Sequence, residues 1–218
     1  MRSFFNVIIV QAAVCAIFQS SPALAQAPYL AKGNQEVNAF GGLSYGLEHW
    51  RGSFGGNYAY AFNKHVMAYG EYSYFPGITR DLDPKKIDKL KDAASLNLIR
   101  GLDRAVKFND FHGGVHIRLP IFPEQRIVPY LSGGFGAISG RLNGKAQVQQ
   151  GSRVNPVDFN VSETVPAVNA GGGFRLYLTG NGRFGIRLEA KIYKPLSGEI
   201  VGTAPFGKVS LGVFYQFQ

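Results

Sequence analysis

The most regular feature of this sequence is the alternation of apolar residues with polar or small ones in short runs. The run 183–194 shows it most clearly. Its apolar face consists of Phe184, Ile186, Leu188, Ala190 and Ile192. Its other face consists of Arg183, Arg187, Glu189, Lys191 and Tyr193. A period of two residues is that of a β-strand, whose successive side chains point to opposite faces.

Eight such runs follow one another along the chain, which contains 28 Gly, 17 Phe and 11 Tyr. Aromatic residues in short alternating runs favour strands over helices. The expected strands are residues 35–46, 50–62, 65–75, 105–119, 126–140, 165–179, 183–194 and 207–217. The sequence therefore predicts an all-β protein.

The connections between these runs alternate in length. Those after the second, fourth and sixth runs are short, whereas those after the third, fifth and seventh are the longer segments 76–104, 141–164 and 195–206. Outer-membrane barrels have an even strand count, with short turns at one end and long loops at the other. We therefore predict an eight-stranded antiparallel up-and-down transmembrane β-barrel. Alternation alone leaves open a soluble periplasmic carrier of the lipocalin type, with an apolar interior.

The N-terminus is typical of a secretory signal peptide, which we place at residues 1–25. Arg2 supplies the positive charge, an apolar stretch runs to Phe18, and Ala23–Leu24–Ala25 forms a small-x-small cleavage site. Residues 26–218 then form one barrel domain, located in a bacterial outer membrane. Cys15 is the only cysteine, so the mature chain has no disulfide, no thiol catalysis and no cysteine-based metal site.

Two of the long connections have patterns of their own. In the connection between strands three and four, Asp83–Pro84 is typical of a helix start, and apolar residues recur at helical spacing before Gly101. We expect a short amphipathic helix over residues 83–101. It would pack on the barrel rim, or alternatively act as a lid or lie on the lipid surface. The segment 141–164 is polar, and we expect a mobile loop there.

The chain carries a net charge of +9. Its basic residues are dispersed and no nucleic-acid-binding motif is present, so we expect no nucleic-acid partner. Lipid phosphates and lipopolysaccharide are the anionic partners expected of an exported barrel. We also expect contact with the outer-membrane assembly machinery, and a monomeric protein.

The residues that alternate with the lipid-facing ones would face the lumen of the barrel. This predicts a polar lumen that contains both acidic and basic side chains. The inward-facing residues would be Glu71, Asp110, His112, His116, Arg118, Arg175, Arg187, Glu189, Lys191 and Lys208. Unpaired buried charges are costly, so we expect a network of ion pairs that fills the lumen. The alternative is a narrow, gated polar conduit, although eight strands leave room for little besides side chains.

The sequence predicts no catalytic residue, cofactor or metal site. His112 and His116 are four residues apart on one strand, or about 13 Å, too far to share one metal. Ser132 and other serines lie in no recognisable nucleophile motif, yet a lipid-modifying barrel enzyme stays an alternative. Aromatic residues near strand ends, Tyr130 and Tyr193 among them, are expected to form interfacial girdles.

Three segments carry a resemblance to a known family. Pro129–Tyr130–Leu131–Ser132–Gly133–Gly134–Phe135–Gly136–Ala137 resembles the fifth strand of OmpA-like outer-membrane β-barrel domains. Residues 171–178 and 182–190 resemble that family's sixth and seventh strands. The resemblance implies eight antiparallel strands, a lipid-facing apolar band and a plugged polar lumen. It also implies a non-enzymatic role that is structural, adhesive or weakly porin-like. Family members usually end in an aromatic residue that assists assembly, whereas here Phe217 is followed by Gln218.

Overall fold

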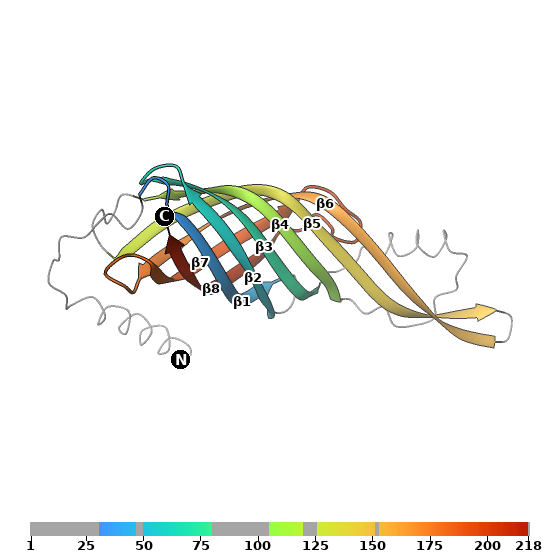
Figure 1. Cartoon of the computed structure of the whole chain (residues 1–218). Helices are drawn as coiled ribbons and strands as arrows, with labels where there is room; N and C mark the ends of the chain where they lie inside the picture. The colour runs from blue at the N-terminus through green and yellow to red at the C-terminus, as the bar shows by residue number, and fades with distance from the viewer. Residues whose placement is uncertain (1–30, 47–49, 80–104, 120–125, 151–152, 218) are drawn as a thin grey trace, which may run out of the picture.

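The computed structural model describes residues 31–46, 50–79, 105–119, 126–150 and 153–217. Eight strands form a closed barrel in which each pairs antiparallel with the next and β1 pairs with β8 (Figure 1). The strands are β1 Gln35–Tyr45, β2 Trp50–Ala61, β3 Val66–Thr79, β4 Ala105–Arg118, β5 Ile127–Gln150, β6 Arg153–Tyr177, β7 Phe184–Pro195 and β8 Phe206–Phe217. The predicted fold is confirmed.

The short connections β2–β3, β4–β5 and β6–β7 lie at one end of the barrel, together with the start of β1 and the end of β8. The β2–β3 turn is held by Asn63, whose Oδ1 accepts hydrogen bonds from the backbone N–H groups of His65 and Val66. Short turns of outer-membrane barrels face the periplasm. We therefore call this end the inner end and the opposite end the outer end.

The segment 141–164 corrects one prediction, because it is not a loop. Strands β5 and β6 continue through it as a regular antiparallel pair up to Gln150↔Arg153, and they extend beyond the other strands (Figure 1). A two-stranded ribbon in water can carry polar residues on both faces, so a polar sequence does not exclude it. The predicted helix at 83–101 and the predicted signal peptide at 1–25 lie outside the described residues.

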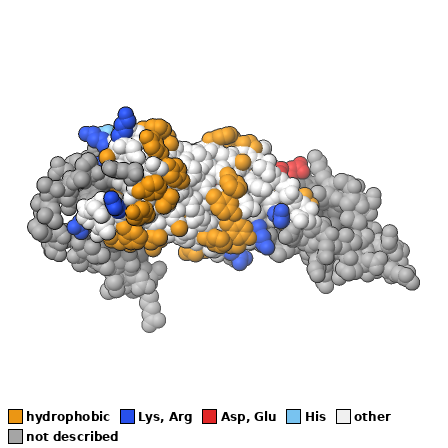
Figure 2. All heavy atoms as spheres, viewed as in Figure 1, with side chains coloured by type: hydrophobic (Ala, Val, Ile, Leu, Met, Phe, Trp, Pro, Cys, Tyr) orange, Lys and Arg blue, Asp and Glu red, His pale blue; other side chains and the backbone are white. Residues whose placement is uncertain are grey.

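The apolar face of every strand points away from the lumen. Large hydrophobic side chains such as Phe54, Phe135, Ile192 and Leu211 are more than half exposed. Figure 2 shows hydrophobic side chains in two bands across the visible face of the barrel. A lipocalin-like carrier would need the opposite arrangement, with these groups inside. A closed barrel with an apolar exterior satisfies its backbone hydrogen bonds internally, as a membrane span requires.

Inward-facing glycines leave room for aromatic rings that cross the lumen. A Cβ atom on Gly134 would lie 2.6 Å from the Tyr69 hydroxyl oxygen and 2.7 Å from the Gly113 carbonyl oxygen. On Gly114 it would lie 2.9 Å from the Tyr69 ring. Tyr69 reaches across to β6, where its hydroxyl donates to Asn169 Oδ1 at 3.0 Å.

Candidate functional site

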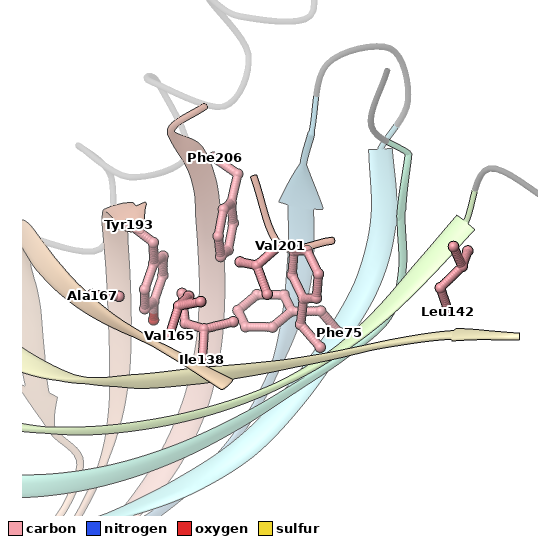
Figure 3. Close-up of a cluster of buried hydrophobic side chains, with 9 residues drawn as sticks. Phe75, Ile138, Leu142, Val165, Ala167, Tyr193, Val201 and Phe206 are labelled. Carbon is pink, nitrogen blue, oxygen red and sulfur yellow. The ribbon is translucent and has the colours of Figure 1, made fainter. Parts of the chain in front are cut away.

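The outer end of the lumen is filled by apolar side chains (Figure 3). They come from β3 to β8 and from the β7–β8 connection, and all are nearly inaccessible to solvent. The cluster contains Phe75, Phe108, Ile138, Leu142, Val165, Ala167, Tyr193, Val201 and Phe206. Phe75 makes edge-to-face contacts with Tyr193 and Phe206, and the rings of Tyr193 and Phe206 stack at a centroid distance of 5.1 Å.

One member of this cluster, Val201, belongs to the connection that follows β7. It is held in place by Glu163 of β6, whose carboxylate accepts hydrogen bonds from three consecutive backbone N–H groups, those of Glu199, Ile200 and Val201, at 2.8–3.1 Å. The connection thereby brings Val201 into the apolar cluster at the outer end of the lumen (Figure 3).

Charged side chains fill the middle of the lumen, with Glu71 of β3 as one centre. Its carboxylate lies 2.7 Å from the Nζ atoms of both Lys191 and Lys208 and 3.5 Å from an Arg187 nitrogen. It also accepts a hydrogen bond from the Tyr193 hydroxyl at 3.1 Å. Three cations from β7 and β8 thus converge on one carboxylate.

The second centre joins Glu36 of β1 to two arginines. Arg175 Nε donates to Glu36 at 2.9 Å, and an Arg187 nitrogen lies 3.4 Å from the same carboxylate. Arg187 also donates to Glu189 at 2.6 Å. Arg175 lies over the ring of Tyr130, with its Cζ atom 4.4 Å from the ring centroid, so cation–π attraction adds to the ion pairs.

The two histidines lie within this packed interior. His116 is stacked on Tyr69 at a centroid distance of 4.3 Å, and its Nδ1 is 2.8 Å from an Arg175 nitrogen. The Nδ1 of His112 contacts Asp110, and its Nε2 is 3.1 Å from the carbonyl oxygen of Ala167. Ser132 is the register partner of His116, but both lie in the filled lumen. Among the described residues no group of three potential ligands could hold a metal ion.

The inner end contains two smaller apolar clusters. One consists of Ala59, Ala61, Met67 and Tyr69, and the other of Val128, Tyr177 and Phe214. The described lumen is therefore layered, with apolar side chains at both ends and ion pairs between them. Burial of so many charges is tolerated because each has an opposite charge or hydrogen-bond partner close by.

The structure places nine of the ten sequence-predicted lumen residues in buried positions inside the barrel. They are Glu71, Asp110, His112, His116, Arg175, Arg187, Glu189, Lys191 and Lys208. Arg118 shares their orientation by strand alternation but is only half-buried at the inner end of β4.

Among the lumen groups that sequence reasoning missed or misplaced, four take part in the contacts described above. Glu36 is buried and pairs with Arg175, and the alternation that places Val37 outward could have revealed it. Tyr69 lies on an inward position of β3 by the same alternation. Tyr130 and Tyr193 are buried inside the lumen, so their expected place in the interfacial girdles is wrong. Strand alternation puts both tyrosines on the lumen face, and this decides their location although they lie near strand ends.

Comparison with known proteins places this geometry among solved barrels. Neither a family model nor a curated protein matches the sequence. A major outer membrane protein from Thermus thermophilus is 10% identical with a TM-score of 0.52, over 85% of this chain and 99% of that one. OprG from Pseudomonas aeruginosa is 9% identical with a TM-score of 0.50, over 88% of this chain and 99% of that one.

These similarities concern the fold, and they agree with the architecture described above. The closed antiparallel barrel, the apolar exterior and the charged interior are the features of a membrane-spanning barrel. The chain is therefore an eight-stranded β-barrel of the outer-membrane type, with the fold expected from its resemblance to OmpA-like domains.

Proposed function

We propose that this protein is a non-enzymatic, closed barrel that contributes to envelope structure and presents its outer connections at the cell surface. The observation that carries the proposal is the filled lumen. The apolar cluster that includes Val201 occupies its outer end, and ion pairs around Glu71 and Glu36 occupy its middle. An eight-stranded barrel has little interior space beyond its own side chains.

The arrangement of histidines supports a non-enzymatic role over a lipid-modifying one. Nucleophilic catalysis needs a serine, a histidine and an orienting acid in mutual reach, together with a place for substrate. The ring nitrogens of His112 face Asp110 and the Ala167 carbonyl oxygen, and His116 lies between Tyr69 and Arg175. In this geometry the histidines serve packing and charge balance.

The outer surface supports lipid and lipopolysaccharide as the partners of the barrel. We expect the protein to be inserted by the outer-membrane assembly machinery and to stand in the bilayer as a monomer. The ribbon formed by the outer parts of β5 and β6 extends beyond the neighbouring strands and offers the largest described structure for contacts at the cell surface.

Planar-bilayer conductance tests the closed lumen. We expect no stepwise current from the refolded wild-type protein at moderate voltage. Replacing residues of the outer, middle and inner layers together, as in V201G/F206A/R187A/F214A, should open a path and produce steps if the variant still shows heat-dependent gel mobility. Stepwise conductance from the wild type would contradict the proposal and favour the polar conduit.

A further inference from the structure

The outer wall of the barrel contains a shallow groove on its lipid-facing side. It is lined by the exposed aromatic side chains of Tyr58, Tyr72 and Phe111, and its volume is about 670 Å³. Outward-facing glycines form its floor: Gly56, Gly70 and Gly113. Gly70 and Gly113 are register partners on β3 and β4, and a Cβ atom on Gly70 would meet no atom within 4 Å.

Strand β4 leads from this groove to a pair of exposed cations. Lys107 of β4 and Arg141 of β5 are register partners, and both are exposed. Like charges placed directly opposite each other destabilise a strand pair unless an anion lies between them. No ion pair found among the described residues involves either side chain.

The depth of this pair along the barrel matches the lipid headgroup region. On the outward face, the register pair Phe111↔Ala137 is followed toward the outer end by Asn109↔Ser139 and then by Lys107↔Arg141. The surface thus changes from apolar to polar to cationic over four residues, or about 13 Å. Tyr72 bridges the change, since its ring packs against Phe111 and its hydroxyl donates to Asn109.

We propose that this face of the barrel binds one phosphorylated lipid of the outer leaflet. An acyl chain lies in the glycine-floored groove and a headgroup phosphate lies between Lys107 and Arg141. The phosphate supplies an anion to two cations that form no ion pair among the described residues, through charge-assisted hydrogen bonds. This inference deepens the proposed function, because it rests on the barrel standing in the membrane with the end that carries Lys107 outward.

The test measures lipid adducts by native mass spectrometry of the full mature barrel in detergent, with bisphosphorylated lipid A as the probe. K107Q/R141Q should bind it at least about tenfold more weakly than the wild type, from the loss of two surface cations. The matched control K64Q/R183Q removes two exposed cations at the inner end and should leave binding unchanged. Dephosphorylated lipid A should bind the wild type and K107Q/R141Q equally weakly.

A second pair of variants tests the groove. G70L fills the floor of the groove and should also weaken lipid A binding. The control G41L places the same side chain at another lipid-facing glycine, where a Cβ atom likewise meets no atom within 4 Å. G41L should leave lipid A binding unchanged. Heat-dependent gel mobility confirms that each variant folds. Binding by K107Q/R141Q equal to that of K64Q/R183Q, or binding by G70L equal to that of G41L, would overturn the inference. Wild-type conductance is measured separately, so failure here is distinguishable from failure of the closed-lumen proposal.

Discussion

Replacing Glu71 with glutamine should destabilise the barrel more than replacing either of its two lysine partners. Glu71 is within ion-pair distance of Lys191, Lys208 and Arg187. The neutral amide would leave buried cations without a full counter-charge. Lys208 would be affected most, because Glu71 is the carboxylate with which it forms its ion pair among the described residues.

The expected magnitudes follow from this asymmetry. Removal of one partner from a buried ion pair costs about 3–5 kcal/mol, and we expect E71Q to lower the free energy of unfolding by that amount. K208M should cost less, because Glu71 keeps Lys191 at 2.7 Å. In the double variant E71Q/K208M the charge left unpaired by E71Q is removed, so the two effects should not add.

Urea unfolding of the refolded protein in lipid vesicles measures these free energies. Fluorescence of Trp50, the only tryptophan, reports on unfolding because its side chain lies on the outer surface. E199Q, which neutralises an exposed carboxylate, serves as the control and should change stability little. If E71Q costs less than about 1 kcal/mol, or if the effects of E71Q and K208M are additive, the ion pairs around Glu71 are not energetically coupled.

Three further predictions concern other layers of the barrel. V201A should lower the free energy of unfolding by about 2 kcal/mol, because it removes two buried carbon atoms from the outer cluster, and urea titration measures it. G134V should abolish the heat-dependent gel shift because its side chain would collide with Tyr69 and the β4 backbone, whereas G41V, where a Cβ meets no atom within 4 Å, should fold. L211R should cost about 2–4 kcal/mol, as expected for arginine on the lipid face near the bilayer midplane. An equal cost for the inner-rim variant Q35R would contradict that placement.

The strand count and the inward direction of most charged lumen residues were predictable from the sequence, because a period of two residues survives in the runs that form the strands. The run around Leu188 shows this well. The same alternation placed Glu71, Arg187 and Lys191 in the lumen before any contact was known. The alternation could not predict which acid forms an ion pair with which base, because partners such as Glu36 and Arg175 are 139 residues apart in sequence.

Other features depend on contacts that have no local signal. Val201 lies in a connection without alternation, and its burial depends on the carboxylate of Glu163 on another strand. The segment 141–164 has a polar sequence, and a two-stranded ribbon can have the same composition as a loop, so the sequence could not distinguish the two. Tyr130 was assigned to an interfacial girdle because it lies near a strand end, although strand alternation puts it on the lumen face.

The distribution of the charged layer over the strands has a consequence for assembly. Glu36 comes from β1, Glu71 from β3, Arg175 from β6 and Lys208 from β8, so the first carboxylate of the chain finds its guanidinium partners only when the last strands have arrived. A half-built sheet would carry unneutralised charges, which the hydrocarbon region does not tolerate. Closure is therefore expected to occur in one cooperative step, while the lumen face still has access to water.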